Sequence, residues 1–247
     1  MLLVRLWDGF AHLQALLGGH AGPGSVLERD GLVASVVPGA PDSPTLNAAV
    51  AIEADRAPEH IEELRARYAE AKVRRWGVWL DGSASLAAQT LAQAGMVVTT
   101  ASPGMGATLA ELPGTSAGDA PPRLADLTTV GRVNDLAYGN YDARLERTLA
   151  PLPNGILRGY RADMHGKPAA VALTLHHGED CGVSFVATIP KARRKGLASI
   201  VMRQALAAAR EGGCTTTTLQ ATEIGERLYT ALGYRRLTVM QLWERRP

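Results

Sequence analysis

The sequence is poor in lysine and cysteine. Its only lysines are Lys72, Lys167, Lys191 and Lys195. Basic residues that are almost all arginine, together with abundant alanine, glycine and leucine, suggest a GC-rich bacterial genome. The two cysteines, Cys181 and Cys214, are far apart in the sequence and lack a metal-binding spacing. We therefore expect reduced thiols and no metal site, as in a cytoplasmic protein.

The sequence also lacks a long apolar run and an excess of charge of one sign. Arg5 and Asp8 interrupt the apolar stretch 1–19 and no basic residues precede it, so it is a poor signal peptide. No other stretch is long and apolar enough to span a bilayer, and we expect a soluble, cytoplasmic protein. The net charge of +2 gives no reason to expect a nucleic-acid partner.

A linker divides the 247 residues into two halves of similar length. The stretch Leu112–Arg123 is rich in proline, glycine and small residues and has no apolar periodicity. We take residues 113–122 as the linker, residues 1–112 as a first domain and residues 123–247 as a second domain. A chain of this length can bury the core of one domain or of two.

Both halves predict the same order of strands and helices. The second half reads as a short strand and a helix, three strands over 155–188, the helix 197–211, a strand, the helix "IGERLYTALGY" and a last strand. The first half reads as a hairpin at Asp30-Gly31, a strand, a helix, the strand "RRWGVWL", a helix ending at Gly95 and a last strand. Sliding the halves by about 138 positions places Gly95 on Gly233, which indicates an internal duplication.

The stretch Phe185–Ser199, "FVATIPKARRKGLAS", has the composition of an anion site. An apolar strand leads into the basic loop Arg193–Lys195, then Gly196, then a long helix. The first N–H groups of a helix attract negative charge, Gly196 permits close approach, and Ala198 leaves the first turn unobstructed, a combination that favours phosphate or pyrophosphate. The stretch is neither a P-loop nor a dinucleotide fingerprint. Taken alone, it also fits a solvated helix start.

The neighbouring elements add a resemblance to a known family. A strand, Arg193-x-x-Gly196-x-Ala198, a long helix, another strand and a helix with "LYTALGY" resemble the GNAT superfamily of acyl-CoA-dependent N-acetyltransferases, over about residues 123–246. The resemblance implies an α/β (mixed α+β) fold with two tandem GNAT-like domains, each a twisted mixed sheet flanked by helices. It also implies an N-acetyltransferase that uses acetyl-CoA as co-substrate and no metal.

The resemblance assigns roles to this sequence. The basic loop would hold the pyrophosphate of coenzyme A, and the preceding strand would splay from its neighbour and pair with the pantetheine arm. The residues implied to bind the co-substrate are Phe185, Val186, Ala187, Thr188, Arg193, Arg194, Lys195, Gly196, Leu197, Ala198, Ser199, Thr222 and Tyr229.

The resemblance also implies direct attack by a neutral amine on the thioester. Backbone groups of Val186 and Thr188 would orient the thioester and polarise its carbonyl, and Tyr229 would donate a proton to the departing thiolate. The alternative for Tyr229 is an aromatic residue half in the core. Many family members have asparagine at the position of Thr222, and threonine reaches less far.

The general base is open, because "CGVSFVAT" lacks the glutamate that many members carry there. The candidates are Glu223, Asp142, Glu179 and Asp180, or a water chain. We rank Glu223 first, since it lies near the start of the tyrosine helix, although capping that helix would equally explain it.

The first half departs from the motif. At the same offset, Arg193, Gly196, Ala198 and Tyr229 are replaced by Asp55, Pro58, His60 and Leu91. Acidic residues repel pyrophosphate and Pro58 removes an N–H. We therefore expect a degenerate GNAT-like domain without a co-substrate site.

The acceptor is a small-molecule amine or a protein amino group that the sequence does not identify. Tyr138 and Tyr141 are candidates to line its pocket, although helix packing explains them equally well. Two alternative functions are a tandem acetyltransferase resembling mycothiol synthase and a non-catalytic acyl-CoA sensor that binds a protein partner. Tyr229 argues against the sensor, which would not need an acid at the sulfur.

Overall fold

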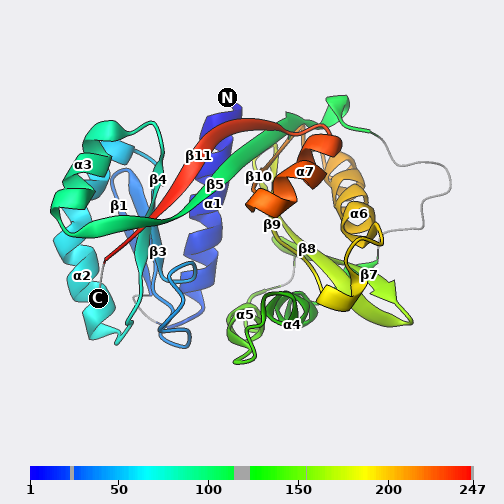
Figure 1. Cartoon of the computed structure of the whole chain (residues 1–247), viewed down its shortest axis with the longest axis horizontal. Coiled ribbons are helices and arrows are strands. Elements are labelled where there is room, and N and C mark those ends of the chain that lie inside the picture. Colours follow the sequence, from blue (N-terminus) through cyan, green and yellow to red (C-terminus); the bar gives the residue numbers. More distant parts are fainter. Residues whose placement is uncertain (23–24, 114–122, 154, 246–247) are drawn as a thin grey trace. The chain divides into compact units, whose positions relative to one another are not determined.

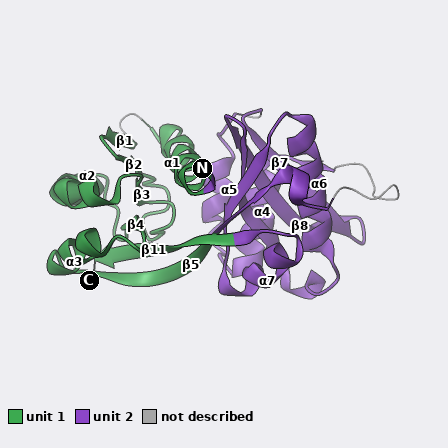
Figure 2. Ribbon diagram, turned by 90° about the horizontal axis from the view of Figure 1, so that it is seen from above, with its two compact units in different colours: residues 1, 3–104, 236–247 green, residues 2, 105–235 purple. Residues whose placement is uncertain are grey.

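The computed structural model describes residues 1–22, 25–113, 123–153 and 155–245, which form two compact units (Figures 1 and 2). Unit 1 comprises residues 1, 3–104 and 236–247, and unit 2 comprises residues 2 and 105–235. The predicted linker lies outside the described residues, except for Pro113. The boundaries of the units therefore differ from a division at the linker, because unit 1 includes the C-terminal strand.

Unit 1 is a mixed sheet with helices. Its elements are α1 (Leu2–Gly19), β1 (Val26–Arg29), β2 (Leu32–Ser35), β3 (Ala48–Ala51), η1 (Ala54–His60), α2 (Ile61–Glu70), β4 (Gly77–Asp81), α3 (Ser85–Gln93), the first part of β5 (Met96–Thr108) and β11 (Arg235–Arg245). The strand order is β1-β2-β3-β4-β11-β5. β3 and β4 run parallel, whereas β1–β2, β2–β3 and β4–β11 are antiparallel.

Unit 2 is also a mixed sheet with helices. Its elements are the end of β5, η2 (Leu109–Glu111), β6 (Leu124–Ala125), α4 (Leu127–Tyr138), α5 (Arg144–Leu149), β7 (Leu157–Met164), β8 (Lys167–His177), β9 (Asp180–Thr188), η3 (Pro190–Ala192), α6 (Leu197–Glu211), β10 (Thr216–Gln220) and α7 (Glu223–Ala231). The strand order is β5-β10-β9-β8-β7-β6. β9 and β10 run parallel, whereas β6–β7, β7–β8 and β8–β9 are antiparallel. The predicted mixed α/β fold is confirmed.

Helix α6 shows how the sequence builds the core of unit 2. It is rich in alanine and leucine, which favour the helix. One of its faces is buried at helical spacing, formed by Val201, Met202, Ala205, Leu206 and Ala209. These side chains share a core cluster with Cys181 and Val183 of β9. The helix that the residues 197–211 predict is confirmed at both ends.

Helices α3 and α7 occupy corresponding positions in the two halves of the sequence. Helix α3 starts at Ser85 and α7 at Glu223, a difference of 223 − 85 = 138 residues, and their last residues differ by 231 − 93 = 138. Gly95 and Gly233 follow these helices with φ of 79° and 100°. This left-handed conformation favours glycine. The structure therefore contains the predicted match of Gly95 with Gly233.

The halves exchange their last strands. β11, from the end of the second half, pairs with β4 in unit 1, where Leu242 lies opposite Trp79. The end of β5, from the first half, lies beside β10 in unit 2. Met240 and Leu242 are buried in the same core cluster as Trp79. The two units thus each depend on a strand from the other half of the sequence.

The strand exchange can be tested by unfolding unit 1. All four tryptophans, at positions 7, 76, 79 and 243, belong to this unit, so tryptophan fluorescence follows its unfolding. Leu242→Ala should lower the free energy of unfolding of unit 1 by about 2–5 kcal/mol, through lost burial and a cavity. Urea unfolding followed by tryptophan fluorescence measures this change.

Leu86→Ala is the matched control. Leu86 lies in α3 of unit 1 and is 66% exposed, so its loss should change the free energy of unfolding by no more than about 0.5 kcal/mol. An unchanged tryptophan transition in Leu242→Ala would contradict a role of β11 in the core of unit 1.

Candidate GNAT active site

Strands β9 and β10 pair over only part of their length. Their parallel register joins Asp180 to Thr216 and ends with Val183 opposite Leu219. β9 continues to Thr188, so the segment Ser184–Thr188 extends beyond the register with β10. A strand edge that leaves its neighbour can pair with an extended ligand through its backbone groups.

A bulge changes the direction of this end of β9. Its register with β8 passes from Ser184 opposite Leu173 to Ala187 opposite Val171, so Phe185 and Val186 together face a single residue. Phe185 has a φ of 51°. A non-glycine residue in this region costs about 1–3 kcal/mol, and such strain is concentrated at functional sites. A bulge also leaves backbone groups out of the ladder.

The N-terminus of α6 follows after a short loop. Gly196 is its N-cap, with a φ of 76°, and the first intrahelical hydrogen bond runs from the N–H of Ile200 to the carbonyl of Gly196 at 3.0 Å. No side chain caps this helix, and its first turn holds no acidic residue. The first N–H groups of a helix have no intrahelical partner, so Leu197, Ala198 and Ser199 present donors to an anion.

The three basic residues of the loop differ from one another. Arg194 and Lys195 are exposed, and Lys195 Nζ lies 3.6 Å from Met164 Sδ. The guanidinium of Arg193 instead donates from Nε to the carbonyl of Thr188 at 3.2 Å and from Nη2 to the carbonyl of Ala137 at 2.8 Å. Arg193 is exposed like the other two, but these hydrogen bonds hold its side chain between β9 and α4.

Helix α7 places Tyr229 inside unit 2. Thr222 is its N-cap, and Thr222 Oγ1 accepts the N–H of Gly225 at 3.1 Å. A Cβ on Gly225 would lie 3.2 Å from Tyr229 Cε2, so glycine makes room for the tyrosine ring. Tyr229 is 6% exposed and meets Tyr234 edge-on, with 5.9 Å between ring centroids.

The surroundings keep Tyr229 protonated. Burial raises the pKa of Tyr229 far above its usual range, and the nearby Tyr138 acts in the same direction. A phenol with a raised pKa remains a hydrogen-bond donor at neutral and mildly alkaline pH. Tyr138 itself is 57% exposed; partial burial raises its pKa, and the charge of Arg193 acts against that shift.

The base candidates lie in different places. Asp180 is buried and accepts hydrogen bonds from Thr216 Oγ1 and Thr218 Oγ1, both at 2.6 Å. Glu179 accepts from Thr215 Oγ1 at 3.2 Å. Asp180 is the first residue of β9 and Glu179 directly precedes it, so they lie roughly 16 Å and 20 Å along the strand from Phe185 at about 3.3 Å per residue.

The other two candidates for the general base, Asp142 and Glu223, lie away from the start of β9. Asp142 is bonded to Arg144 at 3.0 Å, and this hydrogen bond lowers the pKa of Asp142, which weakens it as a base. Glu223 is the first residue of α7 and is exposed. Of the four carboxylates, Glu223 alone stands on the tyrosine helix.

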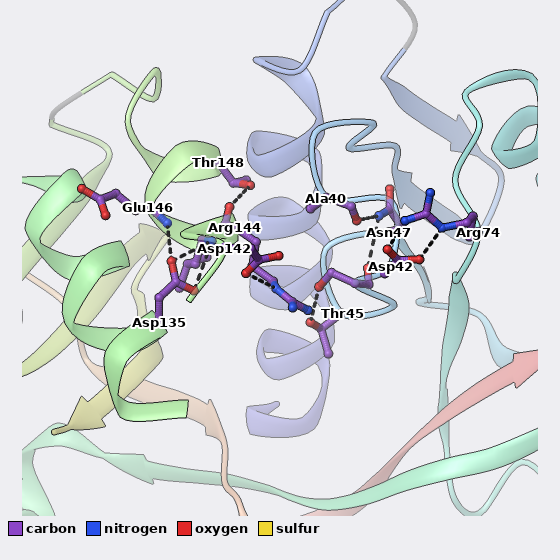
Figure 3. Close-up of polar contacts among 12 residues, drawn as sticks. Ala40, Asp42, Thr45, Asn47, Arg74, Asp135, Asp142, Arg144, Glu146 and Thr148 are labelled. Carbon is purple, nitrogen blue, oxygen red and sulfur yellow. Dashed lines mark hydrogen bonds and ion pairs between the residues drawn. The ribbon is translucent and has the colours of Figure 1, made fainter. Parts of the chain in front are cut away.

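Helices α4 and α5 form a block next to β9. The carboxylate of Asp135 in α4 is buried and accepts the N–H groups of Leu145 and Glu146, the latter at 2.9 Å (Figure 3). A Cβ on Gly131 would lie 2.4 Å from the Cα of Glu146, so the two helices touch. Sequence reasoning missed Asp135, because a single aspartate inside a helix does not reveal its distant partners.

Comparison with known proteins identifies this arrangement. Residues 133–234 match the Acetyltransferase (GNAT) family. The segment 133–234 therefore belongs to the GNAT superfamily. The matched residues include the end of β9, the Arg193–Ser199 loop and Tyr229, which confirms the resemblance seen in the sequence. No curated protein matches the chain.

Solved structures share the fold over more than the GNAT domain. A GCN5-related N-acetyltransferase from Kribbella flavida is 22% identical with a TM-score of 0.70, and the match covers 99% of this chain and 95% of that one. A GCN5-related N-acetyltransferase from Sphaerobacter thermophilus is 14% identical, with a TM-score of 0.60 and coverages of 88% and 78%. A functionally unknown protein from Staphylococcus epidermidis is 9% identical, with a TM-score of 0.64 and coverages of 90% and 94%.

Unit 1 lacks the features of the GNAT site within its described residues. β3 ends at Ala51, one residue after Val50 pairs with Trp79, so no long free end follows the β3–β4 ladder. The short 3-10 helix η1, which contains Asp55 and Pro58, follows β3. Trp79 is buried and packs edge-on against Phe10.

The described part of the chain lacks a metal cluster and a membrane-spanning helix. No group of three or more His, Cys, Asp or Glu residues there is arranged to hold a metal ion. No helix in the same residues is both long and apolar enough to cross a membrane.

Substitution of Gly196 tests whether the Arg193–Ser199 loop binds coenzyme A. Gly196→Ala adds a Cβ that meets nothing within 4 Å in the protein, so the variant should fold. The added carbon occupies the space through which a phosphate would reach the backbone, and alanine is strained at this φ. We expect the affinity for coenzyme A to fall at least about tenfold, equivalent to 1.4 kcal/mol, measured by isothermal titration calorimetry.

Gly95→Ala provides the matched control. Gly95 has a φ of 79°, also has open space around its Cβ position, and lies in unit 1. It should suffer the same backbone strain without losing affinity. Equal losses in both variants would show that strain, rather than the loop, controls binding.

Proposed function

We propose that the protein transfers an acetyl group from acetyl-CoA to a primary amine. The observation that carries this proposal is the free end of β9, with its bulge at Phe185, one short loop away from the glycine-capped N-terminus of α6. An extended pantetheine arm with a pyrophosphate matches this combination of a strand edge and a positive helix end.

The residues of unit 2 fit such a co-substrate. The N–H groups at the start of α6 would receive the pyrophosphate, and the exposed Arg194 and Lys195 would add positive charge. The backbone of Val186, Ala187 and Thr188 would pair with the pantetheine amides. Thr222 Oγ1 already accepts a hydrogen bond within α7, so its hydroxyl would contribute as a donor.

For the transfer, the protein must hold the amine next to the thioester, stabilise the carbonyl oxygen and protonate the thiolate. A neutral amine held next to the thioester attacks the carbonyl carbon; the C–N bond forms and the C–S bond breaks. The N–H at the bulge, near Val186, stabilises the negative charge that develops on the carbonyl oxygen. Tyr229 donates its proton to the departing thiolate, a role that suits its protonated state.

The proton released by the amine needs an acceptor. We propose Glu223, directly or through water, because Asp180 and Glu179 lie at the other end of β9 and Asp142 is bound to Arg144. The amine would be a small molecule or a protein amino group, and we propose that Tyr138 and Tyr141, at the end of α4 and in the loop that follows, line its approach.

The first prediction of this proposal concerns stoichiometry. In the described residues of unit 1, β3 has no long free end, and the first turn of α2 carries the acidic residues Glu62 and Glu63, so acetyl-CoA should bind once per chain. Isothermal titration calorimetry should therefore give about one site. Two equivalent sites would contradict the assignment of unit 1 as a domain without co-substrate, and saturation at half a site would indicate a shared site.

The second prediction concerns Tyr229→Phe, which removes the hydroxyl and keeps the ring. General acid catalysis contributes roughly a hundredfold or more, so the single-turnover rate with a responsive amine should fall by that order while the Kd for acetyl-CoA stays constant. Quenched-flow measurement with amines from a panel tests this. Tyr68→Phe, which removes a hydroxyl bonded to the Ser35 carbonyl in unit 1, should leave the rate unchanged.

The outcome separates an enzyme from a sensor. A wild-type protein that binds acetyl-CoA but acetylates no amine would favour the non-catalytic sensor. A folded Tyr229→Phe variant with the wild-type rate would assign Tyr229 to packing, and water or another group would serve the thiolate.

A further inference from the structure

The Arg193 side chain joins the end of β9 to α4, where it reaches the carbonyl of Ala137, 56 residues before it in the sequence. Its Nε bonds to the carbonyl of Thr188 at the end of β9, and its Nη2 bonds to the carbonyl of Ala137 in the last turn of α4. The guanidinium is a planar fork whose donors point in fixed directions. One side chain therefore sets the spacing between the co-substrate loop and α4.

The end of α4 is a favourable place for this cation. The last carbonyls of a helix have no intrahelical partner and form the negative end of the helix dipole. α4 ends at Gly139, in the left-handed conformation with a φ of 73°, and the carbonyl of Asp135 accepts the N–H of Asn140 at 2.8 Å. The Ala137 carbonyl, in the same turn, accepts a hydrogen bond from Arg193 Nη2. The loop thus adds an ordering contact to this turn.

A shift of the last turn of α4 would change the surroundings of Tyr229, the proposed acid. Tyr138 follows Ala137 directly and interacts electrostatically with both Arg193 and Tyr229. α4 packs against β8 and β9, and it is locked to α5 through Asp135 and Gly131. The contact therefore reaches the α4–α5 block, which borders the proposed path of the amine.

We propose that Arg193 is a positioning residue that couples the co-substrate loop to the acceptor side of the site. When the loop closes on pyrophosphate, Arg193 holds the last turn of α4 in place, so that Tyr138 is ordered as acetyl-CoA binds. The helix N–H groups, Arg194 and Lys195 meet the phosphate charge. This inference rests on the proposed function, since it requires coenzyme A to bind at the loop.

The coupling is read by amide hydrogen exchange with and without saturating coenzyme A. In the wild type, the ligand should slow exchange in the loop, at residues 196–199, and also at Gly139 and Asn140. A coupling energy of the usual size corresponds to a change of about fivefold or more. Replacing a residue with a purely structural role would change the exchange rates equally with and without coenzyme A. Replacing a coupling residue would instead change the protection that coenzyme A adds.

Arg193→Met keeps the length of the side chain and removes both donors. In this variant, coenzyme A should still protect residues 196–199, but the extra protection at Gly139 and Asn140 should be lost. Arg194→Met is the matched control, because it removes the same charge one residue away and should keep the response of α4. Arg193→Lys, which retains the charge but lacks the fork, should also lose most of the response and serves if the methionine variant does not fold.

The outcomes are distinct. Full protection of Gly139 and Asn140 in Arg193→Met, an equal loss in Arg194→Met, or a wild-type α4 that ignores the ligand while the loop responds would each overturn the coupling. A wild-type loop that shows no response to coenzyme A would overturn the proposed function, and the inference with it.

Discussion

The point at which β9 stops pairing with β10 governs the arrangement of unit 2. Backbone groups that leave a ladder need other partners, because an unsatisfied buried N–H or carbonyl is costly. Beyond Val183, β9 bulges at Phe185 and turns through η3 into the loop before α6. A strand edge and a positive helix end are thereby brought within one short loop of each other, and Arg193 spans the same turn toward α4.

Unit 1 shows that the fold alone does not create this site. Its helices and strands correspond to those of unit 2 at an offset of 138 residues at α3 and α7, yet β3 ends almost where its pairing with β4 ends. Pro58 stands where unit 2 has Gly196, and the buried Trp79 fills the core beside Phe10. A few local residues therefore separate a sheet with a free strand end from one whose strands stay paired.

Local features of the site were predictable from the sequence, and contacts between distant segments were not. Alanine periodicity predicted α6, and the Gly196 corner predicted its N-terminus, since both depend on neighbouring residues. The partner of the Arg193 guanidinium depends on how α4 packs against β9, which no local pattern encodes. Thr222 was predicted to contact pantetheine, and its oxygen caps α7 in the structure. The alternation of β11 likewise indicated a strand without indicating which strand it would join.

The exchange of the last strands has a consequence for synthesis on the ribosome. Most of unit 1 emerges before unit 2, but its sheet and core need β11 (Arg235–Arg245), which follows all the strands of unit 2 in the sequence. Domains usually fold in order as they leave the ribosome. Here β4 of unit 1 stays unpaired on one side until β11 has emerged, whereas unit 2 has all of its strands as soon as β10 has emerged. Of the two units, the one whose elements begin earlier in the sequence is thus completed later.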